Sequence, residues 1–243
     1  MNEILYNKEY YQGDDKHCGS DECKKYDMHW WSYRYYAGLV KKYIKAGAIL
    51  ELGCAHGYLL SFLPDSKYKK YGKDISDYTF QSALIKNPKA TFYKGDVTTL
   101  PEFNDQTIDL VIAKYVMEHL ENPNLCLEDC SRVLKNNGYF IFSVPNTSSL
   151  LRKAKGEQWI GDRDPTHKSV LTPEEWKNLL KQNGFKIIKE FSDGWWDVPY
   201  IKYIPKIIQF IIFGWMTVCQ IFFIGQWIPV KFGENLIIVA RKN

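Results

Sequence analysis

Short, mainly apolar runs along the chain alternate with segments of helical periodicity. The clearest runs lie at residues 48–52, 108–113 and 138–144, and further strands are predicted at residues 68–74, 91–94, 185–191 and 235–241. Short apolar runs are typical of parallel strands covered on both faces. Between the runs, large apolar residues recur at helical spacing, as at Trp31, Tyr35, Leu39 and Tyr43. Alternating strands and helices predict an α/β fold with a doubly wound sheet.

Local signals place several helix ends. Thr172, Pro173 and Glu175 form a complete helix start, with a cap, a proline in the first turn and a capping-box glutamate. That helix is predicted to end at residues 183–184 (Asn-Gly). A helix over residues 125–134 is predicted to stop in a left-handed turn at residues 136–138 (Asn-Asn-Gly).

The strand at 48–52 runs into a glycine turn, which predicts a cofactor site. Gly53 and Gly57 let the backbone turn sharply and approach a ligand, and the following helix start favours negative charge. A dinucleotide fingerprint needs glycines at positions 55 and 58, where the chain has Ala55 and Tyr58, so NAD is disfavoured. Glu51 before the turn instead favours a ligand with an ammonium group.

Residues 51–57, Glu-Leu-Gly-Cys-Ala-His-Gly, resemble motif I (E/D-x-G-x-G-x-G) of class I S-adenosylmethionine-dependent methyltransferases, with Ala55 at the middle glycine. Residues 164–167, the capped helix and the Gly-Phe that follows it resemble the small-molecule methyltransferases related to ubiquinone-biosynthesis enzymes. The resemblance covers roughly residues 30–191 and the last strand. It implies a Rossmann-like sheet of seven strands with the last antiparallel, and S-adenosylmethionine as cofactor.

The expected cofactor contacts follow the first three strands. Asp74 ends the second strand, at the position where an acid accepts the ribose hydroxyls. By resemblance, Ile75 lies against the adenine ring and Asp96 binds the adenine amino group, although a turn aspartate also caps its own loop. The full expected set is Glu51, Gly53, Cys54, Ala55, Gly57, Asp74, Ile75, Asp96, Val97 and Lys114.

The segment 114–120 follows the fourth strand, where enzymes of this family place residues beside the transferred methyl group. The Asn-Pro-Pro-Tyr and Asp-Pro-Pro-Tyr signatures are absent, which counts against adenine in DNA or RNA as the acceptor. His119 and His167 are the candidate catalytic bases, because histidine is neutral at working pH. A structural role, capping a turn or bonding within a loop, explains each equally well. Glu118 and His119 resemble part of a metal-assisted site, but Tyr115 stands where a further acid is needed, so no metal is expected.

Two other functional classes are weighed against methyl transfer to an oxygen or nitrogen of a small molecule. A nicotinamide-dependent sugar-modifying oxidoreductase would share the strand, glycine turn and helix, but the chain has no Tyr-x-x-x-Lys pair for hydride chemistry. A non-catalytic methyltransferase-like scaffold would lose the cofactor contacts, whereas Glu51, Asp74 and Asp96 are all present. Both alternatives are minor.

Composition places the chain among globular proteins. It has 45% hydrophobic residues in 243, enough for one buried core, and its net charge of +4 is spread out, which does not indicate nucleic-acid binding. Six cysteines without paired spacing and no signal peptide in residues 1–10 favour the cytoplasm. His17, Cys18, Cys23 and His29 match no common zinc spacing. We expect one domain: an arm and cap helix (1–47), a core sheet (48–191 and 235–243) and an insertion (192–234).

The insertion contains 24 uncharged residues, from Ile207 to Val230, between Lys206 and Lys231. The length suits a membrane span, but the last strand must return to the sheet, so a single crossing is excluded. Gln209, Gly214, Gln220 and Gln226 predict broken helices within it. Three roles stay open for residues 199–232: an apolar acceptor pocket, a homodimer face, or an in-plane membrane contact with its lysines near lipid headgroups. A buried cap without a lipid role is the plainer alternative.

Overall fold

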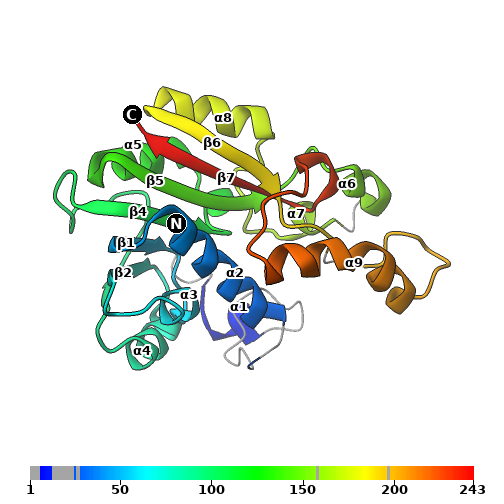
Figure 1. Cartoon of the computed structure of the whole chain (residues 1–243), viewed down its shortest axis with the longest axis horizontal. Helices are drawn as coiled ribbons and strands as arrows, with labels where there is room; N and C mark the ends of the chain where they lie inside the picture. Colours follow the sequence, from blue (N-terminus) through cyan, green and yellow to red (C-terminus); the bar gives the residue numbers. More distant parts are fainter. Residues whose placement is uncertain (1–5, 13–24, 26–27, 157–158, 196–197) are drawn as a thin grey trace.

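The computed structural model describes residues 6–12, 25, 28–156, 159–195 and 198–243. Within them, one sheet has the strand order β3-β2-β1-β4-β5-β7-β6 (Figure 1). Its strands are β1 (Gly47–Leu52), β2 (Tyr68–Asp74), β3 (Thr91–Lys94), β4 (Ile108–Lys114), β5 (Leu134–Pro145), β6 (Phe185–Ser192) and β7 (Asn235–Lys242). β1 runs parallel to β2 and β4, and β7 runs antiparallel to β5 and β6. The predicted seven-stranded sheet with its last strand antiparallel is confirmed.

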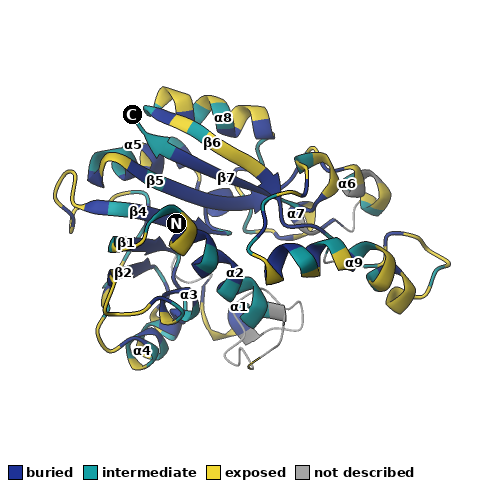
Figure 2. Cartoon of the chain, viewed as in Figure 1, coloured by how far each residue is buried: buried dark blue, intermediate teal, exposed yellow. Residues whose placement is uncertain are grey.

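Helices cover both faces of the sheet and make two cores. The helices are α1 (Lys8–Gln12), α2 (Met28–Tyr43), α3 (Tyr58–Ser61), α4 (Asp77–Lys86), α5 (Pro123–Val133), α6 (Leu150–Lys155), α7 (Ile160–Arg163), α8 (Pro173–Gln182) and α9 (Lys206–Phe222), with short 3-10 turns η2 (Met117–His119) and η4 (Val230–Phe232). Ile49 and Ile112 pack with α2, α3 and α4, whereas Leu50 and Val111 pack with α5 and α8. Successive strand side chains point to opposite faces, so each central strand contributes residues to both cores. Figure 2 shows that β5 and β7 are buried along most of their length.

The boundary between α5 and β5 differs from the sequence prediction. α5 ends at Val133 and β5 begins at once at Leu134, so residues 136–138 do not stop the helix. Asn137 does adopt a left-handed conformation, with φ of 64°, but it lies inside β5. There the pairing with β4 shifts, from Ile108 opposite Leu134 to Leu110 opposite Tyr139. The left-handed conformation predicted here is confirmed, but the predicted helix end is wrong, because this turn is an irregularity within β5.

The insertion between β6 and β7 contains a helix, as predicted. Gln209, Gly214 and Gln220 do not break it, because all three lie within the single helix α9, which begins directly after Pro205 and ends at Phe222. Gln226 lies in the irregular segment that follows this helix. β6 and β7 pair with each other on either side of the insertion, so the chain returns to the sheet. None of the helices in the described part of the chain is both long enough and apolar enough to cross a bilayer.

We expect the capping box at the start of α8 to contribute measurably to the stability of the fold. The Thr172 hydroxyl accepts from the Glu175 amide at 3.3 Å, and the Glu175 carboxylate accepts from the Thr172 amide at 2.7 Å. Thr172→Ala should lower the free energy of unfolding by about 1 kcal/mol. Thr172→Ser, which keeps the hydroxyl, should stay within about 0.5 kcal/mol of wild type in denaturant unfolding. Equal losses in both variants would show that the cap does not contribute.

Candidate active site

The sheet order brings the predicted cofactor residues to one edge. β3, β2, β1 and β4 are neighbours and parallel, so their carboxyl ends face the same side. Asp74 and Lys114 are the last residues of β2 and β4, Glu51 is the last but one of β1, and Asp96 lies in the loop after β3. Ligands in open α/β sheets bind beside such strand ends, where the strand order reverses. Four segments distant in sequence therefore meet where a cofactor would bind.

The glycine turn after β1 has left-handed backbone at three positions. Gly53, Ala55 and Gly57 have φ of 64°, 42° and 71°. A Cβ atom on Gly53 would lie 2.2 Å from a methyl carbon of Val116, and one on Gly57 would lie 2.7 Å from the amide nitrogen of Asn87. Only glycine fits at positions 53 and 57, whereas Ala55 adopts a conformation that L-residues occupy at some energetic cost. The helix expected after this turn, α3, is a single turn, and Leu59 and Leu60 are its buried residues.

The Asp74 carboxylate ties the first two strand ends together. One oxygen accepts from the Ala55 amide at 2.7 Å, and the other accepts from the Ser76 amide at 2.8 Å. Burial raises the pKa of Asp74, although the backbone amides oppose that shift. A carboxylate held at this position is available to accept hydroxyl groups from a ligand beside it.

The other predicted cofactor residues differ in how deeply they are buried. Asp96 is half-buried and accepts from the Thr98 amide at 2.8 Å, so its loop-capping role is present. Ile75 is half-buried beside Asp74, whereas Val97 and Cys54 are buried, one in each core. The Cys54 amide donates to the Lys73 carbonyl at 3.3 Å.

Glu51 is the most unusual side chain of this edge. Glu51 is only 2% exposed, and its Oε2 atom has no hydrogen-bond partner among the described residues. Burial raises the pKa of Glu51 well above its usual value, and the positive charge of Lys114 opposes this shift. A buried acceptor without a partner is costly, and an ammonium group of a ligand would satisfy it. Glu51 therefore fits the amino-acid end of S-adenosylmethionine.

Lys114 lies among tyrosine rings. Its ammonium is 4.7 Å from the ring centroid of Tyr33, 5.6 Å from Tyr36 and 4.4 Å from Tyr115. Aromatic faces attract cations, so these rings stabilise the charge at a buried position. Tyr33 and Tyr36 were not predicted, because the sequence pattern of α2 marked Trp31, Tyr35, Leu39 and Tyr43 as its apolar stripe.

The N-terminal segment, expected to be an irregular arm, contains the short helix α1 and lies over the Asp74 loop. The Ser76 hydroxyl donates to the Tyr6 carbonyl at 2.6 Å. The Tyr11 ring stacks on Tyr78 with centroids 6.0 Å apart, and the Tyr6 ring meets His119 edge-on at 6.0 Å. This arm therefore reaches both the cofactor edge and the histidines. His17, Cys18 and Cys23, whose spacing does not indicate a zinc site, lie outside the described residues.

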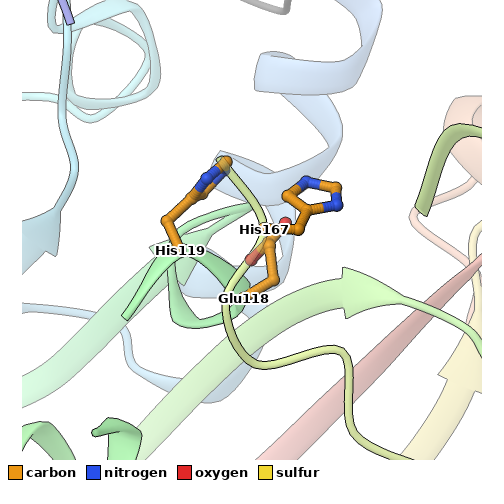
Figure 3. A group of neighbouring side chains, drawn as sticks. All are labelled: Glu118, His119 and His167. Atoms are coloured by element: carbon orange, nitrogen blue, oxygen red, sulfur yellow. The ribbon is translucent and has the colours of Figure 1, made fainter. Parts of the chain in front are cut away.

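His119 and His167 come together from two separate segments. Figure 3 shows His119 with Glu118 on η2 and His167 on the loop before α8. The imidazole centroids are 4.8 Å apart, and both ring systems are largely buried. The loop is held to η2 by the Glu118 carbonyl, which accepts from the amides of Lys168 and Ser169 at 2.7 and 2.8 Å.

A hydrogen-bond series fixes the tautomer of His119. The Thr166 hydroxyl donates to Asp164 Oδ1 at 2.6 Å, because a carboxylate can only accept. The Thr166 oxygen therefore accepts from His119 Nδ1, 2.9 Å away, and the lone pair of the neutral ring is on Nε2. Burial raises the pKa of Asp164, but the Thr166 hydrogen bonds and the nearby histidines outweigh this and lower it.

His167 is oriented by a different contact. Its Nδ1 donates to the Gly161 carbonyl at 2.9 Å, and its Nε2 lies 3.7 Å from Asp164 Oδ2. Ligand atoms of Glu118, His119 and His167 all lie within 4.8 Å of one another, so this cluster could also hold a metal ion. The expectation that no metal is used stays a prediction.

A buried polar cluster beside Lys114 was missed by sequence reasoning. Asp193 accepts from the Tyr115 hydroxyl at 2.9 Å and from the Asn235 side-chain amide at 2.8 Å. Burial raises the pKa of Asp193 to about 6, and the hydrogen bonds of Asn235 and Tyr115 limit the rise. The three residues follow β4, follow β6 and begin β7, so no local sequence signal joins them.

The comparisons with known proteins agree with this geometry. The profile of a methyltransferase domain family matches residues 30–190, more than half of the chain. The chain therefore belongs to this family and is an S-adenosylmethionine-dependent methyltransferase of the class I fold. The predicted family, fold and cofactor are confirmed.

Individual relatives are similar over part of their length. A probable S-adenosylmethionine-dependent methyltransferase of Mycolicibacterium smegmatis is 28% identical over 57% of this chain and 52% of its own. A ubiquinone biosynthesis O-methyltransferase of Maricaulis maris is 24% identical over 57% of this chain and 59% of its own. The match thus spans little more than half of each relative. A Thermotoga maritima methyltransferase structure, described as a possible histamine N-methyltransferase, superposes with a TM-score of 0.59 and 20% identity, over 88% of this chain and 90% of that one. That likeness shows the fold.

Asp193 makes stability depend on pH. Its folded pKa of about 6 lies above the unfolded value, so the folded chain binds this proton more tightly. The resulting stabilisation is fully present below about pH 4 and is lost as the pH rises through the folded pKa. Relative to Asp193→Asn, the free energy of unfolding of wild type should fall by about 2 to 3 kcal/mol across this range. The exposed change Asp162→Asn is the control, and a wild-type curve parallel to that of Asp193→Asn would contradict the assignment.

Proposed function

We propose that this methyltransferase transfers the methyl group to an oxygen or nitrogen of a small molecule, and that His119 accepts the acceptor's proton. The observation that carries the proposal is the Asp164–Thr166–His119 series, which puts the imidazole lone pair on Nε2. An acceptor hydroxyl or ammonium must lose a proton for transfer, and a positioned neutral histidine suits this step. His119 also directly follows Glu118 on η2, close to the end of β4.

The cofactor would be held by the strand ends. Glu51 would bind its ammonium group, Asp74 its ribose hydroxyls and Asp96 its adenine amino group. The backbone of the turn would pass beside it at Gly53, Cys54, Ala55 and Gly57, with Ile75, Val97 and Lys114 completing the site. When bound, S-adenosylmethionine supplies a methyl group on a positively charged sulfur. The protein's own contribution is then mainly to position the acceptor in line with that group and to exclude water.

Tyrosine rings support an apolar or aromatic acceptor. Tyr36 and Tyr115 lie with edge-on rings 6.4 Å apart, and Tyr6 lies against His119. These rings would contact the flat or apolar part of the acceptor, and Asp193 would offer a polar contact on the same side. An O-methyltransferase and a possible N-methyltransferase are both among the similar proteins, so both acceptor atoms remain within the proposal.

We expect Glu51→Gln to lower the affinity for the cofactor without lowering the stability of the fold. Removing the charge should weaken S-adenosylhomocysteine binding at least about tenfold, because the ligand ammonium loses its counter-charge. The free energy of unfolding should stay level or rise, because an uncompensated buried carboxylate is removed. Calorimetric titration and denaturant unfolding test the two parts, with the exposed change Glu121→Gln as control. Unchanged affinity in Glu51→Gln would refute the role of Glu51.

His119→Ala should lower turnover by roughly 10²-fold or more while leaving S-adenosylhomocysteine affinity near wild type. His167→Ala should lose less, because its Nε2 faces Asp164. Transfer of labelled methyl groups to small molecules of a cell extract provides the measurement. Wild-type turnover in both variants would refute a histidine base.

The same assay distinguishes proton acceptance by His119 from metal binding by the cluster of Glu118, His119 and His167. Proton acceptance by His119 predicts equal turnover with and without a chelator. Loss of turnover with a chelator, restored by a divalent cation, would instead assign Glu118, His119 and His167 to metal binding.

A further inference from the structure

Helix α9 exposes a continuous apolar face, which we call the α9 face. It consists of Ile207, Ile208, Ile211, Ile212, Trp215, Val218 and Phe222, and it continues into Phe223 and Trp227. The spacing from 207 to 222 follows steps of four, four, three and four, which places these residues on one side of the helix. Trp215 is 60% exposed and Phe223 is 68% exposed. Figure 2 shows exposed positions recurring along α9, which extends beyond the end of the sheet. Contiguous exposed apolar surface of this kind marks an interaction site.

The buried side of α9 contains three polar residues, Gln209, Thr217 and Gln220, beside Gly214 and Ile221, whereas an ordinary surface helix buries its apolar side. Gln209 is fully buried near its start. Its side-chain oxygen accepts from the amides of Tyr200 and Ile201 at 2.6 and 2.9 Å, and its nitrogen donates to the carbonyls of Ile201 and Ile204. Both donors of this side-chain amide, and both acceptor positions of its oxygen, are therefore paired with backbone groups of the loop before α9.

Gln220 and Thr217 hold the far end in the same way. The Gln220 nitrogen donates to the Ser192 carbonyl at 2.7 Å, and its oxygen accepts from the amides of Trp227 and Ile228. The Thr217 hydroxyl accepts from the Trp195 amide at 3.0 Å. Rotating α9 to hide its apolar side would leave these groups unpaired, so the outward direction of the α9 face is fixed by the fold.

The charged residues of the segment that carries the α9 face are all positive. Between Val198 and Gly233 the charged residues are Lys202, Lys206 and Lys231, all exposed, and the segment contains no acid. Tyr203 is exposed beside Lys202, and the Lys231 ammonium lies 4.8 Å from the Phe232 ring centroid. Lysines and aromatic rings around an apolar helix face are the composition of helices that lie in a membrane interface.

We propose that the α9 face docks in the plane of an anionic lipid surface, with Lys202, Lys206 and Lys231 at the headgroups. Charge complementarity favours this occupant over a second copy of the chain, because two copies paired face to face would bring the same lysines together without any acid in the segment. This contact does not depend on the acceptor chemistry proposed above.

Vesicle flotation of the full chain tests the proposal. Wild type should float with vesicles of phosphatidylcholine mixed with phosphatidylserine, less at high salt, and much less with phosphatidylcholine alone. The double variant Ile211→Ser and Trp215→Ser should reduce the bound fraction at least about tenfold. The matched control, Ile85→Ser and Leu125→Ser, changes two exposed apolar residues elsewhere and should float like wild type. Thermal unfolding verifies that both double variants remain folded.

Three outcomes would overturn it. Wild type could fail to float with the mixed vesicles, the control could lose as much binding as the α9 variant, or both vesicle types could bind equally. A wild-type dimer in solution that dissociates in the Ile211→Ser and Trp215→Ser variant, without vesicle binding, would assign the α9 face to a second copy instead.

Discussion

A carboxylate buried near the end of a central strand is the main physical constraint on the proposed cofactor site. Glu51 lies on β1, where β2 and β4 pair on either side, so water is excluded from it and burial raises its pKa. The nearby cation, Lys114, is itself held among tyrosine rings and does not fully offset that burial. A fold optimised only for stability would place an apolar residue here, since an unsatisfied acceptor is costly. The conflict is typical of a binding site, where local stability is lower so that a ligand can complete the interactions.

The cofactor edge was largely predictable from sequence, and the physical reason is that its signals are local. A strand, a glycine turn and an acid at the next strand end are each readable within a few residues, and parallel pairing then brings them together. The left-handed backbone of Gly53 and Gly57 follows from the same local rule. What could not be predicted arises from long-range pairing. Asp193 meets Asn235 because β7 inserts between β5 and β6.

Helix α9 shows a second limit of sequence reasoning. Periodicity finds the two sides of a helix, but it does not say which side faces the protein. The glutamines predict broken helices, whereas Gln209 and Gln220 are buried anchors within one helix and Gln226 lies after its end. The usual assumption that apolar residues face inward fails here because Gln209 and Gln220 satisfy backbone groups of neighbouring loops that have no other regular pairing.

Family membership does not identify the acceptor, because several residues near Lys114 and His119 lie outside the part of the chain that matches the family. The family match covers residues 30–190, which contain the strand ends where we propose that the cofactor binds. Tyr6 precedes the match, and Asp193 and Asn235 follow it. Tyr6 nevertheless contacts His119, and Asp193 and Asn235 contact Tyr115, the neighbour of Lys114. In the proposed site, the cofactor part would therefore be built from the shared core, and the acceptor part would draw on segments that the match does not cover. Differences in substrate between related methyltransferases could then arise in these segments without disturbing the buried carboxylate of Glu51.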